Sequence, residues 1–295
     1  MTYNIEVNNL SLKYRNFEAL KDVSFNLEDG KIYGLLGRNG AGKTSLLSIL
    51  ASYRQQTAGS IKIAGVIPYE NAEINQNISF HFQTNYEEET EKVKKMLSIV
   101  EKYRPNYDAE YAKYLVELFK LPMNKYVNKL SKGMQSALEV IMGLASRSPI
   151  TIFDESYLSM DAPTRVKFYN ELLKDQEKHP RIFILSTHLV SEMDYLFDEV
   201  LILDNGKLLL HEDYETLTSK GMSITGNAVE VDKFVAGKRI LSSQQLGKTK
   251  SVMIYGERTE EIENMADRLG LEIGPISLQD LFIHLTEMED SYENK

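Results

Sequence analysis

A glycine-rich segment of the sequence ends in a lysine and a threonine at the spacing of a phosphate-binding loop. Residues 37–44 read G-R-N-G-A-G-K-T, which matches the pattern G-x-x-x-x-G-K-[S/T]. Glycines let backbone N–H groups turn towards phosphate oxygens, and the start of the following helix adds a positive dipole. Lys43 would neutralise the β- and γ-phosphates, and the Thr44 hydroxyl would hold Mg²⁺. The pattern predicts nucleotide binding by eight residues: Gly37, Asn39, Gly40, Ala41, Gly42, Lys43, Thr44 and Ser45.

Two adjacent carboxylates follow an apolar segment further along the chain. Residues 150–155 read I-T-I-F-D-E, which is typical of a buried strand that ends in Asp154 and Glu155. Asp154 is placed to hold Mg²⁺, and Glu155 to reach the attacking water as a general base or orienting group. Two acids after a strand also occur in solvated turns, but the phosphate loop upstream favours catalysis. The two motifs together predict nucleotide hydrolysis.

The segments around these motifs predict an α/β protein. Strand-like segments fill the first 65 residues, residues 86–147 are mostly helical in pattern, and strands then alternate with helices. Within the helical stretch, Glu88 with Lys92 and Glu91 with Lys95 have the i,i+4 spacing of an exposed helix face. Strands that are separated by helices imply a mostly parallel sheet covered on both faces.

The pattern changes near residue 221 and predicts a small α/β appendage over 221–295. Residues 228–235 (AVEVDKFV) and 250–257 (KSVMIYGE) are predicted as strands, and 259–270 and 277–288 as amphipathic helices. In the last of these, Leu278, Leu281, Phe282 and Leu285 recur at i, i+3, i+4 and i+7. We interpret this stripe as core rather than as a partner surface.

Composition restricts the function further. The formal net charge of −9 argues against a broad nucleic-acid-binding face, because such binding is mostly phosphate neutralisation by Lys and Arg. The absence of Cys excludes disulfides and thiolate metal sites. No segment approaches the ~20 apolar residues of a membrane helix, and the first residues lack the pattern of a signal peptide. A role in transport would therefore require a separate membrane partner.

A third motif makes the resemblance to a family specific. Residues 130–135 read L-S-K-G-M-Q, and S-M-D at 159–161 and S-T-H at 186–188 follow in order. Over residues 2–220 the chain resembles the nucleotide-binding domain of ABC ATPases, whose signature is usually LSGGQ. The resemblance implies the P-loop NTPase ABC ATPase fold, with a parallel-sheet core, an N-terminal antiparallel β-subdomain and a helical subdomain at about 86–147. The implied domains are an ABC ATPase domain at 1–220 and a C-terminal α/β accessory region at 221–295.

The resemblance implies a head-to-tail dimer that encloses two ATP molecules. Ser131 and the Gly133 backbone would contact the γ-phosphate bound by the opposite subunit, which suits N–H groups at a helix start. Ser131 is also a good helix N-cap, and both roles are compatible. The signature departs from the usual one at Lys132 and Met134, and Ser156 stands where Pro commonly follows the acids. None of these changes removes a group that the chemistry requires.

Four further roles are carried over from the resemblance. His188 matches the switch histidine that contacts the γ-phosphate, and Asp161 matches the loop that communicates between the two sites. Tyr14 matches the aromatic residue that stacks on adenine. Gln83 is our choice for the glutamine that senses Mg²⁺ and the transport domain.

Three stretches resemble a narrower group, the ATPase subunits of bacterial antibiotic and peptide exporters of the phenol-soluble modulin type. They are residues 129–155, 184–200 and 276–287. The implied function is an ATP-hydrolysing exporter subunit at the cytoplasmic face of the cell membrane, with ATP and Mg²⁺. Its expected partners are an integral-membrane permease and a second copy or a paralogous ATPase, with no nucleic acid. A soluble ABC ATPase of ribosomes or DNA and a sensor or regulatory ATPase are the alternatives.

Overall fold

The computed structural model describes residues 2–293, which fold into two compact units. The first unit comprises the chain up to His188 together with Tyr195–His211. The second comprises Leu189–Asp194 together with the chain from Glu212 onward. These units are defined by compactness alone. The predicted functional domains, an ATPase domain at 1–220 and an accessory region at 221–295, stay a prediction.

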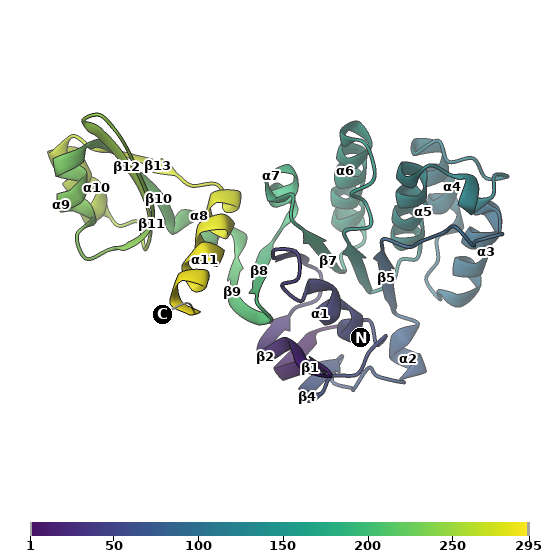
Figure 1. Cartoon of the computed structure of the whole chain (residues 1–295). Coiled ribbons are helices and arrows are strands. Elements are labelled where there is room, and N and C mark those ends of the chain that lie inside the picture. Colours follow the sequence, from purple (N-terminus) through teal and green to yellow (C-terminus); the bar gives the residue numbers. More distant parts are fainter. Residues whose placement is uncertain (1, 294–295) are drawn as a thin grey trace. The chain divides into compact units, whose positions relative to one another are not determined.

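A six-stranded sheet forms the centre of the first unit (Figure 1). Its strands run in the order β5 (Ile78–Phe82), β6 (Ile150–Asp154), β7 (Ile182–Thr187), β3 (Ile32–Leu36), β8 (Glu199–Asp204) and β9 (Lys207–Asp213). The pairs from β5 through β8 are all parallel. Strands β3, β6 and β7 are buried along their whole length, which explains their nearly continuous apolar runs. The predicted parallel sheet is confirmed.

A smaller antiparallel sheet in the first unit joins β2 (Phe17–Leu27), β1 (Ile5–Tyr14) and β4 (Ala58–Ile63). Its buried side chains belong to one hydrophobic core with helix α1 (Lys43–Leu50) and the central sheet. A short helix, α2 (Ala72–Asn75), precedes β5. This sheet is the N-terminal antiparallel β-subdomain that the resemblance implied.

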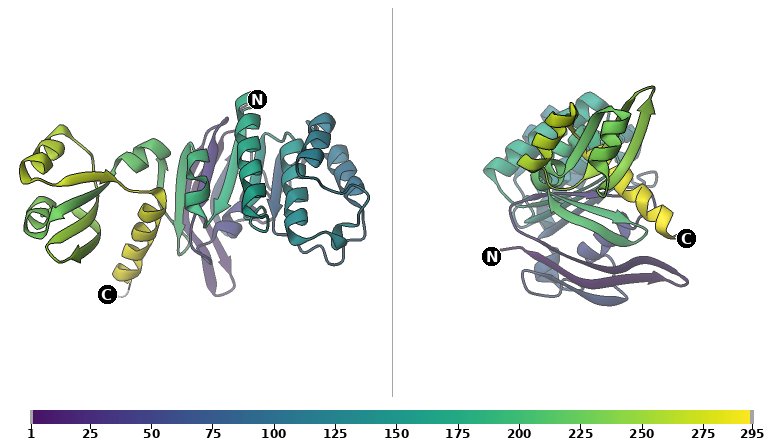
Figure 2. Two further views of the ribbon diagram at one scale, coloured as in Figure 1. Left: turned by 90° about the horizontal axis from the view of Figure 1, so that it is seen from above. Right: turned by 90° about the vertical axis from the view of Figure 1, so that its left-hand side faces the viewer.

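The remaining helices of the first unit are α3 (Val93–Tyr103), α4 (Ala109–Leu118), α5 (Lys132–Ala145) and α6 (Ala162–Lys178). A short 3₁₀ turn, Val127–Lys129, precedes α5. Figure 2 shows α3, α4 and α5 together beyond the β5 edge of the sheet. The predicted helical stretch is confirmed, but the prediction of an exposed helix face with Glu88 and Glu91 is wrong. Helix α3 begins only at Val93, because Lys92 is extended and forms a β-bridge with Tyr126.

The second unit is built around a four-stranded antiparallel sheet. Its order is β11 (Arg239–Leu246), β12 (Thr249–Tyr255), β10 (Gly221–Asn227) and β13 (Glu272–Pro275). The helices of this unit are α7 (Val190–Met193), α8 (Tyr214–Ser219), α9 (Ala228–Val235), α10 (Glu260–Leu269) and α11 (Leu278–Glu293). From β10 to β13 the chain order is β-α-β-β-α-β, the ferredoxin-like arrangement.

One predicted strand of this unit is wrong, because residues 228–235 form helix α9. The side chains of Val231, Phe234 and Val235 are buried at i, i+3 and i+4, and Asn227 caps the helix. Local alternation in the segment A-V-E-V concealed this helical spacing. The stripe on α11 is buried as expected for core, at Leu278, Leu281, Phe282 and Leu285.

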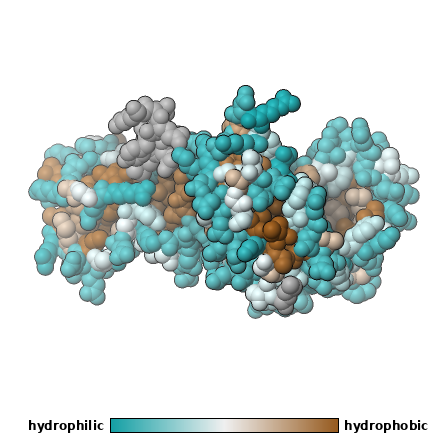
Figure 3. Space-filling view, turned by 90° about the horizontal axis from the view of Figure 1, so that it is seen from below, coloured by the Kyte–Doolittle hydropathy of each residue, from teal (hydrophilic) through white to brown (hydrophobic). Residues whose placement is uncertain are grey.

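Within residues 2–293 no helix is both long enough and apolar enough to cross a membrane. Hydrophilic side chains form most of the face of the molecule seen in Figure 3.

Candidate functional site

The phosphate loop connects the end of β3 to the start of α1, as the motif requires. Two of its positions require glycine, because main-chain carbonyl oxygens of other segments lie close to them. A Cβ on Gly37 would lie 2.6 Å from the Leu203 carbonyl oxygen, and a Cβ on Gly42 would lie 2.7 Å from that of Ala19. Gly42 also has φ of 107°, which L-residues rarely adopt. The loop is therefore held in a conformation that larger residues would disrupt.

Lys43 lies at the start of α1 and reaches back across the loop. Its Nζ donates to the carbonyl oxygens of Gly37 at 2.7 Å and Arg38 at 3.3 Å. The same Nζ lies 3.5 Å from Glu155 Oε1, and the lysine is only 7% exposed. A buried ammonium needs such partners, and phosphate oxygens are partners of the same kind.

The two acids at the end of β6 have different environments. Asp154 is 6% exposed, and its Oδ1 accepts a hydrogen bond from Ser186 Oγ at 2.5 Å. Glu155 has φ of 52°, so the chain turns sharply after the strand. Its Oε1 lies 3.1 Å from His188 Nδ1. One carboxylate is thus fixed within the sheet edge, while the other sits between a lysine and a histidine.

Gln83 directly follows β5 and reaches the same edge of the sheet. Phe82 at the end of β5 pairs with Asp154, because β5 and β6 are parallel neighbours. The Gln83 side-chain amide Nε2 donates to the main-chain carbonyl oxygen of Glu155 at 3.2 Å. The structure thus brings together Lys43, Gln83, Asp154, Glu155 and His188, as the sequence predicted; their individual roles stay predictions.

A cavity of about 310 Å³ opens beside the phosphate loop. Tyr14 lines it, with its hydroxyl 3.3 Å from Ser45 Oγ and the Arg54 guanidinium 4.6 Å from its ring centroid. Phe17, which no sequence motif singled out, lines the same cavity and is 63% exposed. Phe17 pairs with Tyr14 across a β-hairpin. A hairpin pattern in the sequence is therefore the signal that could have identified Phe17 as a neighbour of Tyr14. The cavity is lined by Tyr14, Phe17, Ala19, Arg38, Asn39, Gly40, Gly42, Lys43, Thr44, Ser45 and Glu155.

The oxygen donors at this edge suit Mg²⁺. Thr44 offers a hydroxyl, Asp154 a carboxylate and Gln83 an amide oxygen, all hard ligands. Among residues 2–287, whose side chains the structure describes, no three His, Cys, Asp or Glu side chains form a metal-binding group. Mg²⁺ is usually held by one or two carboxylates together with phosphates and water, and Asp154 offers one such carboxylate at the end of β6.

Ser131 and Gly133 of the signature lie outside the cavity beside the phosphate loop, at the start of α5, and Asp161 lies at the start of α6. Ser131 caps α5 by accepting a hydrogen bond from the Met134 N–H at 3.3 Å. A Cβ on Gly133 would lie 3.1 Å from the Ser159 carbonyl oxygen, a tight contact that a larger residue would make only if its neighbour shifted. Asp161 caps α6, and hydrogen bonds from the Thr164 side chain and N–H lower the pKa of its carboxyl.

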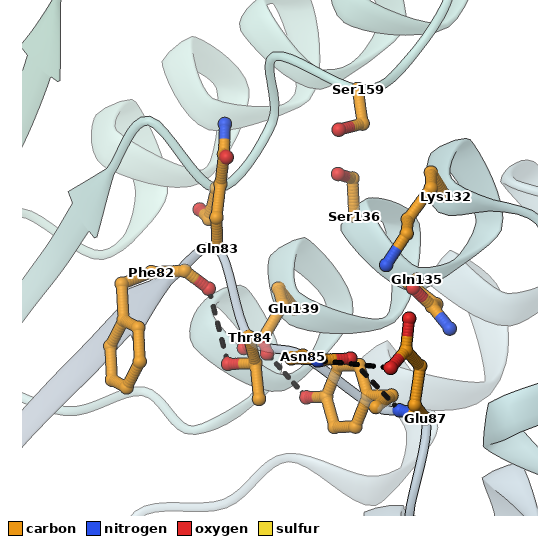
Figure 4. Close-up of a pocket in the computed structure, with 12 residues that line it drawn as sticks. Phe82, Gln83, Thr84, Asn85, Glu87, Lys132, Gln135, Ser136, Glu139 and Ser159 are labelled. Atoms are coloured by element: carbon orange, nitrogen blue, oxygen red, sulfur yellow. Dashed lines mark hydrogen bonds between the residues drawn. The ribbon is translucent and has the colours of Figure 1, made fainter.

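A second cavity, of about 470 Å³, lies between the segment after β5 and the start of α5 (Figure 4). The α5 residues that line it are Lys132, Gln135, Ser136 and Glu139. The rest of its lining is Phe82, Gln83, Thr84, Asn85, Tyr86, Glu87, Ser156 and Ser159. Gln83 therefore borders both the acidic strand end and this cavity.

Comparisons with known proteins agree with this geometry. Residues 20–157 match the family described as ABC transporter. The chain is 25% identical over 283 residues to the ABC transporter ATP-binding protein YtrB of Bacillus subtilis, covering 95% of this chain and 97% of that protein. It is 31% identical over 196 residues to the aliphatic sulfonates import ATP-binding protein SsuB 2 of Pseudomonas syringae pv. tomato, covering 63% and 75%. The dimeric structure of a bacterial ABC transporter cassette superposes with a TM-score of 0.62 and 21% identity, over 71% of this chain and 98% of that one.

Proposed function

The chain belongs to the ABC transporter family of ATP-binding proteins, and we propose that it drives export of a peptide, toxin or antibiotic through a separate membrane subunit. As a member of this family it is an ATP-binding subunit and an ATPase. The observation that carries the catalytic part of the proposal is the convergence of Lys43, Glu155 and His188 beside the phosphate loop.

The proposed mechanism is mainly positioning and charge neutralisation. Lys43 exchanges its carbonyl and carboxylate partners for the β- and γ-phosphate oxygens when ATP binds. Glu155 then orients or deprotonates the attacking water, and His188 donates a hydrogen bond to the γ-phosphate. Thr44, Asp154 and Gln83 would hold Mg²⁺, which would neutralise phosphate charge.

Adenine recognition is proposed for the aromatic side of the cavity. Tyr14 and Phe17 flank it at the end of the β1–β2 hairpin. Because Arg54 already covers one face of the Tyr14 ring, the other face or the exposed ring of Phe17 is available for stacking. Both rings are therefore candidates for the adenine contact.

The site is proposed to be completed by a second ATPase subunit. Ser131, Gly133 and Asp161 are not among the described residues that line the cavity around Lys43. A head-to-tail pair would bring Ser131 and Gly133 to the γ-phosphate of the opposite subunit. The dimeric structure of a cassette with the same fold supports pairing with a second ATPase subunit. The second subunit is either another copy or a paralogue.

The membrane partner is proposed to be an integral-membrane permease, which places the chain at the cytoplasmic face of the cell membrane. The cavity beside Gln83 and α5 is the proposed docking place, because it joins the acidic strand end to the signature helix. The resemblance of residues 129–155, 184–200 and 276–287 to exporter motors supports the outward direction.

Drug and peptide sensitivity of living cells tests the export direction. Host cells in which Glu155→Gln replaces the wild-type residue are expected to become at least about fourfold more sensitive to one class of amphipathic peptide or antibiotic. The reason is that the cargo accumulates when hydrolysis, and with it export, stops. The inhibitory concentration is measured across a panel of such compounds.

Cells that carry Glu177→Gln, on an exposed part of α6, are the control and are expected to match the wild type. Unchanged sensitivity to the whole panel, together with lost uptake of a nutrient, would contradict export and indicate import.

A further inference from the structure

Glu139 of α5 is bonded to residues on both sides of Gln83. The glutamate is 5% exposed, and its Oε2 lies 2.8 Å from His81 Nδ1. The Tyr86 hydroxyl donates a hydrogen bond to the other oxygen, Oε1. His81 lies two residues before Gln83, and Tyr86 lies three residues after it. One carboxylate of α5 therefore holds both ends of the segment that carries Gln83.

The strand and helix on which these groups lie are packed closely. Alternation along β5 directs Ser79 and His81 into the interior, while Phe82 on the opposite side is exposed. A Cβ on Gly143 of α5 would lie only 2.9 Å from His81 Cδ2, so the helix approaches the imidazole without room for a larger residue. Ser79 Oγ lies 2.7 Å from His81 Nε2 and fixes the other side of the ring.

The cluster of His81, Tyr86 and Glu139 would cost folding free energy if its role were only structural. Burying a carboxylate is unfavourable unless its oxygens are hydrogen-bonded, and apolar side chains of similar size often serve stability as well or better. Here both oxygens of Glu139 have partners. Burial and the negative charge of Glu139 raise the pKa of Tyr86, so its hydroxyl remains protonated and able to donate.

We propose that Glu139 is a positioning residue that ties the placement of Gln83 to the signature helix. Ser131, at the start of α5, lies eight residues before Glu139 on the same helix. Through this one carboxylate, the group proposed to act on the chain's own nucleotide is joined to the group proposed to act on the partner's nucleotide. The inference rests on the proposed role of Gln83.

The test is a double-mutant cycle on the purified full-length chain, with Tyr86→Phe and Gln83→Ala made singly and together. Tyr86→Phe removes only the hydroxyl and is expected to lower kcat for ATP about tenfold, with KM for ATP within about twofold of wild type. It is also expected to raise the Mg²⁺ concentration that gives half-maximal rate. In the Gln83→Ala background the same change is expected to alter kcat less than about twofold, because groups that act through one another are not additive.

Tyr111→Phe is the matched control. The Tyr111 hydroxyl donates to Glu171, so this variant removes a tyrosine–glutamate bond between α4 and α6 in the same unit. Both Tyr→Phe variants are expected to lower the Tm by a similar amount, but only Tyr86→Phe is expected to lower kcat.

Three results would overturn the inference. If Tyr86→Phe lowers kcat by the same factor in both backgrounds, Glu139 does not act through Gln83, although the role of Gln83 survives. A kcat of Tyr86→Phe within about twofold of wild type would show that the bond has no part in hydrolysis. Full activity and unchanged Mg²⁺ dependence of Gln83→Ala would instead remove the proposed role of Gln83, and the positioning role with it.

Discussion

Glu155→Gln is expected to lower the kcat of ATP hydrolysis by about 100-fold or more while leaving the Kd for Mg-ATP within about threefold of wild type. Glu155 is the carboxylate between Lys43 Nζ at 3.5 Å and His188 Nδ1 at 3.1 Å. Glutamine has nearly the same shape but cannot accept a proton from water. Single-turnover hydrolysis and equilibrium binding of a fluorescent ATP analogue measure the two quantities separately.

Glu177→Gln makes the same change on an exposed part of α6 and is expected to leave both quantities unchanged. Hydrolysis by the Glu155→Gln protein at the wild-type rate would remove Glu155 from the mechanism. Weak ATP binding by it would instead assign Glu155 to the binding of nucleotide.

Lys43→Ala is expected to weaken ATP binding about 100-fold, with a corresponding loss of hydrolysis at limiting ATP. A charge-assisted contact contributes about 1.5–3 kcal/mol, and each 1.4 kcal/mol changes Kd about tenfold. The ammonium is 7% exposed and already faces the loop and Glu155, so few other groups can take its place. Isothermal titration of Mg-ATP into the purified protein measures the change.

Lys178→Ala, in the exposed last turn of α6, controls for the loss of one positive charge. It is expected to bind ATP like the wild type. A Kd of Lys43→Ala within about twofold of wild type would show that this loop does not hold the phosphates.

The parts of the site that follow one another in sequence are predictable from it. The phosphate loop, the strand that ends in Asp154 and Glu155, and the cap at Ser131 depend on short-range backbone geometry. Parallel pairing then brings the strand ends together, since Phe82 pairs with Asp154. For this reason the amino-acid sequence alone is enough to predict the parallel sheet and the region of the site.

The errors arise where distant contacts decide the local structure. The segment A-V-E-V alternates like a strand, but Val231 and Phe234 are buried together on one face of α9. Charge spacing at Glu88 suggests a helix, but the β-bridge of Lys92 with Tyr126 holds that part of the chain extended. Phe17 is not singled out by any motif because its place beside the cavity depends on the β1–β2 hairpin.

The cluster of His81, Tyr86 and Glu139 could not be predicted either. Glu139 is separated from the other two residues by more than 50 positions in the sequence, and the three meet only because α5 packs on β5. Nothing in their local sequence distinguishes them from surface polar residues.

Co-purification of the Glu155→Gln protein in mild detergent with Mg-ATP tests the central claim most directly, because stalled hydrolysis holds the ATP-bound assembly together. Every chain that co-purifies is identified and its stoichiometry measured. The account predicts a multi-span membrane protein in stoichiometric amount, released when ATP is omitted or when Lys43→Ala is added. Recovery of ribosomes, of a sensor kinase without a permease, or of a soluble dimer alone would contradict the transport function and leave an ATPase of another kind.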